Sequence, residues 1–140
     1  MMIETLVTNA TPTGTTRPAE WLDRLMVRIR SFAQLEENWD SYGAPPIDQS
    51  SIRNAGEFAR QCAVSLTPRT EPDVQPTASG YVEFSWESEN QSVVLNVELL
   101  PNGTVHYLYE NDETAETIEQ ISHWARVIDF LPDQNPDWPG

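Results

Sequence analysis

The 140-residue chain contains no lysine, one cysteine, two histidines and six glycines. The single cysteine, Cys62, excludes an internal disulfide and leaves no thiolate cluster for zinc or an iron–sulfur centre. Its apolar neighbours predict a buried thiol. The scattered glycines form no phosphate-binding loop, and neither His106 nor His123 lies in a recognisable metal or nucleophile motif. The sequence therefore names no reaction and predicts neither a cofactor nor a bound metal.

Long apolar segments are also missing. No run approaches the roughly 20 residues needed to span a bilayer, and the N-terminal segment lacks the cationic start of a secretory signal. We therefore expect a soluble protein in a reducing, cytoplasmic setting. The lack of lysine has three interpretations, namely high genomic GC content, adaptation to high salt and avoidance of lysine modification. Only the first of these requires no function.

What the chain has in excess is acid. Its 22 Asp and Glu residues outnumber eight basic residues, all arginine, and give a net charge of -14. Residues 1–80 carry 10 acids and seven arginines, whereas residues 81–140 carry 12 acids and only Arg126. A field of this sign repels nucleic-acid phosphate and anionic membranes and attracts basic partners. We therefore expect a basic protein partner, and neither direct nucleic-acid binding nor membrane binding.

Apolar spacing predicts two N-terminal helices. From Ala19, apolar residues recur every three or four positions, which predicts a first helix that runs to about Asn38. It should stop near Gly43, and the prolines that follow prevent its continuation. A second helix is predicted to begin after Asp48, which can act as its N-cap, and to end before Pro68.

Apolar residues alternate with polar ones between residues 82 and 110. Period two in three successive runs, with turn residues between them, predicts an antiparallel meander with one wet face. A short leading strand near residues 73–77 would lie at an edge, because Pro76 has no N–H to donate.

The last element is predicted to be a helix. Ile118, Ile121 and Ile128 have helical spacing, and acidic residues occupy the expected first turn, where the helix dipole favours anions. The expected fold class is α+β, with two N-terminal helices, a three- to four-stranded antiparallel meander and a C-terminal helix packed on one face in a two-layer domain.

The chain is expected to form a single domain. The small polar residues of segment 1–17 predict a flexible leader. The α+β domain would then span residues 18–131, and three prolines predict an extended tail at 132–140.

The segment LEENWDSYGAPPI, residues 35–47, admits three interpretations. Its three acids, among them Asp40, could bind a cation. Alternatively, Trp39 and Tyr42 could form a ligand platform beside Asp40. The third interpretation is structural, because a helix end needs a glycine such as Gly43, a proline stop and aromatic residues that lock the turn onto the core.

Two strings carry a family resemblance. NWDSYGAPP at residues 38–46 follows an amphipathic helix, and GYVEFSW at residues 80–86 precedes an Asn-Gly turn. In these strings the chain resembles a family of small uncharacterised bacterial proteins over residues 35–109. The resemblance implies a shared fold, with any binding surface that goes with it, and it brings no activity.

The carboxylates beyond Tyr81 are expected to form an outward patch on the sheet and the last helix. Our leading hypothesis is a small non-enzymatic module that masks a basic surface of a partner, as antitoxins, immunity proteins, nuclease inhibitors and nucleic-acid mimics do. The expected partner-binding residues, with two tyrosines as aromatic anchors, are Glu83, Glu87, Glu98, Tyr107, Tyr109, Glu110, Glu113, Glu116 and Glu119.

Two other classes remain open at this point. The chain could be a structural or oligomerising subunit of a larger bacterial assembly, including a homodimer that places the arginine-bearing first helix against an acidic sheet. It could also be a carboxylate-dependent hydrolase, because Glu83 and Glu98 could face each other across neighbouring strands.

Overall fold

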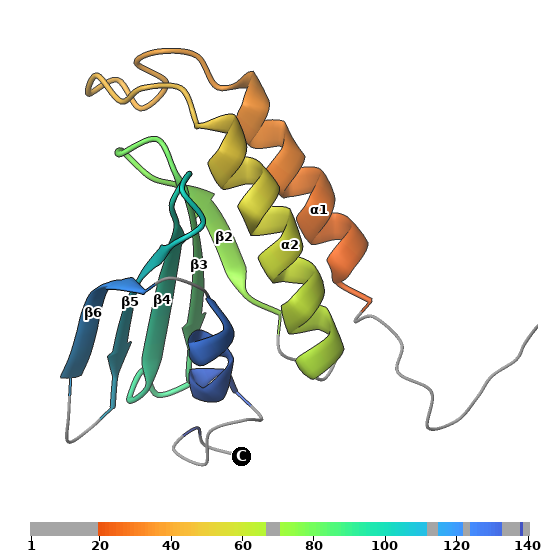
Figure 1. Cartoon of the computed structure of the whole chain (residues 1–140), viewed down its shortest axis with the longest axis vertical. Coiled ribbons are helices and arrows are strands. Elements are labelled where there is room, and N and C mark those ends of the chain that lie inside the picture. Colours follow the sequence, from red (N-terminus) through yellow and green to blue (C-terminus); the bar gives the residue numbers. More distant parts are fainter. Residues whose placement is uncertain (1–19, 67–70, 112–114, 122–123, 133–137, 139–140) are drawn as a thin grey trace, which may run out of the picture.

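Two helices cover one face of a five-stranded antiparallel sheet (Figure 1). This computed structural model describes residues 20–66, 71–111, 115–121, 124–132 and 138, with the backbone alone described for 115–121 and 124–126. The α+β class and the antiparallel meander are confirmed. The predicted leader and most of the predicted tail lie outside the described residues.

Helix α1 (Leu22–Ser31) is shorter than expected. It buries Leu25 and Ile29 against the core, and one 3-10 turn, η1 (Phe32–Gln34), continues it. The apolar stripe that holds the helix on the core ends at this turn, and the backbone becomes extended at Leu35. The helix therefore stops before the predicted Asn38.

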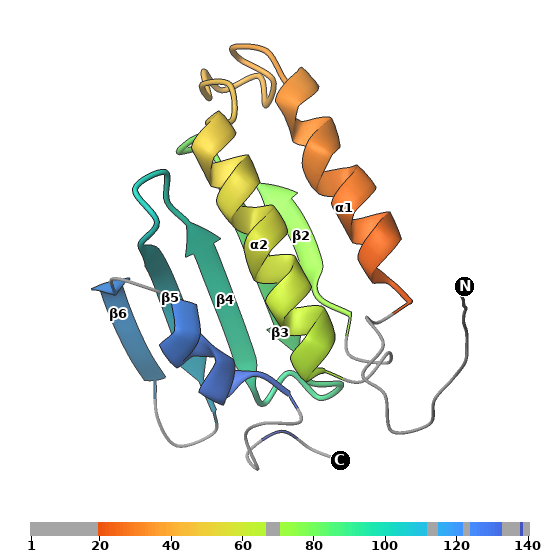
Figure 2. The same cartoon turned by 45° about the vertical axis from the view of Figure 1, so that its right-hand side comes forward.

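Helix α2 (Gln49–Ser65) begins as predicted. The carboxylate of Asp48 accepts hydrogen bonds from the backbone N–H groups of Ser50 at 2.7 Å and Ser51 at 3.3 Å, as an N-cap does. The helix lies alongside α1 (Figure 2), and Gly56 permits the close approach. A Cβ atom at Gly56 would lie only 3.2 Å from the terminal methyl of Met26.

The sheet is a simple meander in which neighbouring strands follow each other along the chain. Its strands are β2 (Asp73–Pro76), β3 (Val82–Glu87), β4 (Val94–Leu99), β5 (Val105–Glu110) and β6 (Ala115–Ile121). One face, which we call the covered face, packs against the helices and buries the apolar residues of the alternating runs. The predicted leading strand is β2, and it lies at the edge of the sheet as expected.

The predicted C-terminal helix is wrong over its first half. Residues 115–121 form the fifth strand, which pairs with β5. Ile118 pairs with Tyr107 and Ile121 pairs with Val105, so three steps along β6 match two steps along β5. This irregularity places residues with helical spacing at equivalent positions of a strand, which explains why the spacing misled.

A short 3-10 helix, η2 (Trp124–Phe130), occupies part of the place given to that helix. It packs on the covered face, where Val127 and the following Leu131 are fully buried. Both Figure 1 and Figure 2 show η2 on the same side of the sheet as α2. The other face carries no described element, and we call it the open face.

Candidate functional site

The open face of the sheet gathers carboxylates, because the residues that alternate with the core are acidic in several rows. They are half-buried or exposed. We define the acidic sheet face as Asp73, Glu83, Glu87, Glu98 and Glu110.

The row at one end of this face is organised by hydrogen bonds. Glu83 and Glu98 are direct partners on β3 and β4. Gln75 donates to Glu83 through Nε2 at 2.9 Å, and Thr77 donates to Glu98 through Oγ1 at 2.8 Å. Nδ1 of His106 lies 3.6 Å from Oε1 of Glu98. The two carboxylates are thus held in place although like charges on opposite strands repel each other.

Apolar side chains also lie on this face, in its other end row and in its middle row. Val94 on β4 lies between Glu87 and Glu110 in the register, and Leu108 on β5 lies beside Asn96. Both apolar side chains are half-buried. The face therefore combines carboxylates with two partly accessible apolar side chains.

The arginines of the described residues form their ion pairs elsewhere. Arg24 binds Glu71 at 2.8 Å, and Arg60 binds Glu57 at 2.9 Å within α2. No arginine whose side chain the structure describes forms an ion pair with the acidic sheet face. The acids of this face are therefore not neutralised by the arginines of α1 and α2.

The two predicted aromatic anchors lie on the wrong face. Tyr107 and Tyr109 are each 4% exposed on the covered face, and their ring centroids lie 5.4 and 4.9 Å from that of Phe130. They alternate with His106 and Glu110, so they share the core side of β5 with Val105. Neither tyrosine can contact a partner while η2 is in place.

The acids expected on the last helix are redistributed. Glu116 and Glu119 belong to strand β6, and the backbone register pairs Glu116 with Tyr109. Glu113 lies outside the described residues. Of the predicted acidic residues, Glu83, Glu87, Glu98 and Glu110 are brought together on one face. Asp73 joins them, and sequence reasoning missed it because its strand was only weakly indicated.

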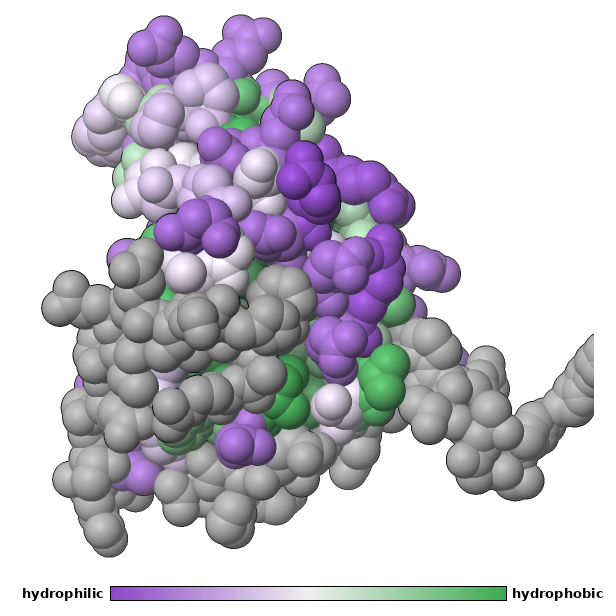
Figure 3. Space-filling model, viewed as in Figure 1, coloured by the Kyte–Doolittle hydropathy of each residue, from purple (hydrophilic) through white to green (hydrophobic). Residues whose placement is uncertain are grey.

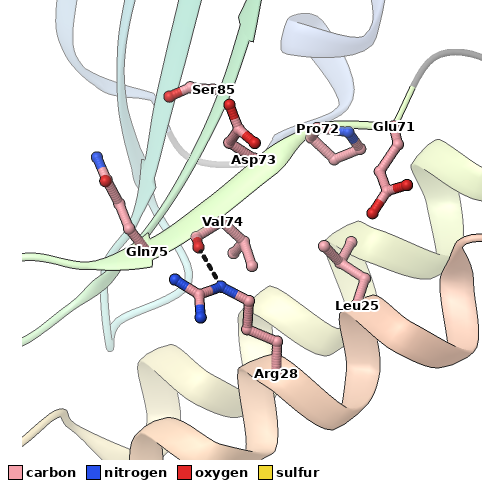
Figure 4. A pocket seen from close by; sticks show the side chains of 8 residues that line it. All are labelled: Leu25, Arg28, Glu71, Pro72, Asp73, Val74, Gln75 and Ser85. Atoms are coloured by element: carbon pink, nitrogen blue, oxygen red, sulfur yellow. Dashed lines mark hydrogen bonds between the residues drawn. The ribbon is translucent and has the colours of Figure 1, made fainter.

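A groove of about 400 Å³ lies at the β2 edge of the sheet, between that strand and α1 (Figure 4). Its residues are Leu25, Arg28, Glu71, Pro72, Asp73, Val74, Gln75 and Ser85. Nε of Arg28 donates to the outward carbonyl of Val74 at 2.8 Å, and its guanidinium carbon lies 5.3 Å from the centroid of the Phe32 ring. This arginine occupies a backbone acceptor of the edge strand, and Pro76 offers no donor, so both protect the edge from pairing.

The loop at residues 35–47 uses its polar groups internally. The carboxylate of Asp40 accepts hydrogen bonds from the N–H groups of Tyr42 and Ala44 at 2.8 and 3.0 Å, and these bonds lower the pKa of Asp40. Trp39 donates through Nε1 to the carbonyl of Pro45 at 2.8 Å. Among the described residues, no group of three or more histidine, cysteine or acidic side chains could hold a metal ion.

Ser51 is a structural residue that sequence reasoning missed. Its buried hydroxyl donates to the carbonyl of Leu99 at 2.5 Å and accepts from the N–H of Val82 at 2.9 Å. It thereby joins the first turn of α2 to β3 and β4 at the end of the sheet where Glu83 and Glu98 lie. The only sequence signal was a serine on the apolar side of a helix.

Comparison of the chain with protein-family models, with curated proteins and with solved structures gave no match. Over the described part of the chain, no helix combines the length and the apolar character that crossing a membrane requires.

Proposed function

We propose that this protein is a small protein-binding module whose acidic sheet face masks a basic surface of a partner protein, in the manner of an antitoxin, an immunity protein or an inhibitor. The observation that supports this most strongly is the gathering of five carboxylates on one face without an arginine partner among the described residues. Such a face attracts lysine and arginine side chains, and it repels nucleic-acid phosphate.

The end row adds a second argument. Glu83 and Glu98 oppose each other directly, and like charges at such a position are destabilising. A guanidinium or ammonium group of a partner placed between them would remove that repulsion. Because Gln75 and Thr77 already fix the two carboxylates, little side-chain entropy is lost when such a group binds.

The geometry favours a different protein as partner over a homodimer of the kind considered above. The arginines of α1 belong to the helix layer, whereas the acidic sheet face lies on the opposite side of the sheet. If α1 of one copy bound the acidic sheet face of a second copy, the acidic sheet face of the first copy and α1 of the second copy would both remain free. It would propagate head to tail and would not close as a two-fold dimer.

The hydrolase alternative gains no support from the groove. Hydrolysis by two carboxylates takes place in a cleft that encloses the substrate. Neither Glu83 nor Glu98 lines the groove at the β2 edge.

Two triple variants with the same change in charge test the proposal. The sheet-face variant carries Glu83→Gln, Glu98→Gln and Glu110→Gln. The helix-layer control carries Glu20→Gln, Asp23→Asn and Glu57→Gln, three exposed acids on or beside the helices.

Each protein is immobilised at equal density and used to capture proteins from a native lysate at low salt, with stepwise salt elution. We expect a basic protein to bind the wild type and the helix-layer control and to elute as salt rises. The sheet-face variant should lose it. Equal loss from both variants would show that total charge, and not this face, determines the capture, and would contradict the proposal.

A further inference from the structure

Tyr42 is an exposed aromatic side chain that lies outside the acidic sheet face. It is 91% exposed, whereas the neighbouring Trp39 is half-buried and packs against the core. The platform of two aromatic rings considered from the sequence is therefore divided, since Trp39 anchors the loop and Tyr42 projects from it. This loop lies between α1 and α2, at the upper end of the molecule in Figure 1.

The loop that carries Tyr42 is closed by its own hydrogen bonds. The N–H of Asn38 donates to the carbonyl of Ala44 at 2.7 Å, and the N–H of Gly43 donates to Oδ1 of Asn38 at 2.7 Å. Asp40 adds two further bonds to the N–H groups of Tyr42 and Ala44. The backbone on both sides of the tyrosine is thus fixed before any partner arrives.

This conformation costs backbone strain. Asn38 and Ser41 both have φ of 67°, in the left-handed region that side chains other than glycine rarely adopt. Strain of this kind persists where the surrounding structure holds it, and it gathers at functional sites. Ser41 directly precedes Tyr42, and Asn38 lies four residues before it.

The loop is also fixed to the sheet. A Cβ atom at Gly80, in the turn between β2 and β3, would lie 3.1 Å from Cγ of Pro45 and 3.1 Å from the carbonyl oxygen of Pro46. The N–H of Asp48 donates to the carbonyl of Gly80 at 2.8 Å. The ring of Tyr42 is therefore carried on a rigid support, which reduces the entropy lost on binding.

The charges around the loop define the partner. From Leu35 to Asp48 the sequence has four acids and no basic residue. On the face seen in Figure 3, most side chains at this end of the molecule are hydrophilic (Figure 3, top). An exposed aromatic ring in an acidic segment suits a guanidinium or ammonium group, which can lie over the ring face.

We propose that Tyr42 is the anchor of a second protein-docking surface, and that this surface takes an arginine or lysine side chain projecting from a basic partner protein. The proposal is independent of the acidic sheet face, because it rests on the exposure of Tyr42, the fixed loop and the local charge. Tyrosine and arginine are also the residue types that most often dominate the binding energy of interfaces.

The test is a titration of the ¹⁵N-labelled full-length chain with a hexa-arginine peptide at physiological salt, followed by NMR. We expect the backbone amides of residues 41–44 to shift with a saturable dependence on peptide concentration. Tyr42→Leu should raise the apparent Kd reported by these amides about fivefold, because it removes the ring face. Tyr42→Phe keeps the ring and should leave the Kd within a factor of two.

Two controls separate this site from general attraction to an acidic protein. Val64→Ala, at another exposed apolar position, should not change the Kd reported by residues 41–44. The sheet-face triple variant should likewise leave these amides responsive. Unshifted loop amides in the wild type, or a Tyr42→Leu variant that binds as the wild type does, would overturn the proposal. Neither result would bear on the acidic sheet face.

Discussion

Ser51→Ala should be one of the most destabilising single-atom deletions in this protein. The hydroxyl of Ser51 is completely buried and joins two backbone groups, the N–H of Val82 and the C=O of Leu99. Alanine leaves both groups buried without this partner. Each unsatisfied group costs about 1–3 kcal/mol, and alanine returns about 0.5 kcal/mol through its higher helix propensity.

The expected net loss is about 3 kcal/mol of unfolding free energy. For a chain of this length that corresponds to a fall in Tm of about 10 °C. Urea unfolding followed by tryptophan fluorescence measures the change directly, with the m-value as a check that the unfolding transition itself is unaltered. Ser50→Ala is the matched control, because Ser50 contributes its N–H, and not its hydroxyl, to the helix cap.

The control should change stability by less than about 0.5 kcal/mol. A Ser51→Ala variant that is equally mild would refute the reasoning. It would mean that the N–H of Val82 and the carbonyl of Leu99 bond to each other directly once the hydroxyl is gone.

Three further predictions follow from the described geometry. Gly103→Ala should lower the free energy of unfolding by about 1 kcal/mol, because Gly103 has a φ of 88° and no close neighbour. Gly80→Ala should lower it by about 1 kcal/mol more in the same urea assay, because Gly80 has a φ of 91° and its added Cβ would also lie 3.1 Å from the loop. Equal losses in the two variants would contradict the close contact of the loop with the turn. Backbone hydrogen bonds lower the pKa of Asp40 in the folded protein. Its stabilisation of the loop is therefore complete above about pH 4, the ordinary pKa range of an unfolded aspartate, and is lost as the pH falls through the lower folded pKa. The NMR signals of the loop amides should accordingly move only in acid. Burial raises the pKa of the Cys62 thiol far above its ordinary value, so a thiol reagent should react at the rate of unfolding; rapid reaction of the native protein would contradict this burial.

The parts of the fold that could be predicted from sequence are those in which one local rule acts alone. Alternation of Val82, Phe84 and Trp86 with polar residues determines which face of β3 is buried, and Asp48 supplies the N-cap that begins α2. These features depend only on neighbouring residues. The location of the acidic sheet face follows from the same alternation.

The parts that could not be predicted depend on contacts between distant residues. The pairing of Ile118 with Tyr107 and of Ile121 with Val105 needs an irregular register that no periodicity reveals. Because residues 115–121 were expected to belong to the last helix, the fifth strand was missed, and so was the packing of η2 against the two tyrosines of β5. The exposure of Tyr42 was likewise not predictable, because it depends on a loop that hydrogen bonds between residues 38 and 44 close.

The most direct test of the account is the association rate of the captured basic partner, measured as a function of salt for the wild type and the two triple variants. The account predicts a steep fall of the wild-type rate with salt. The sheet-face variant should associate at least tenfold more slowly at low salt, and the helix-layer control should match the wild type. Association that is insensitive to salt, or equally slow in both variants, would contradict the claim that the acidic sheet face recognises the partner.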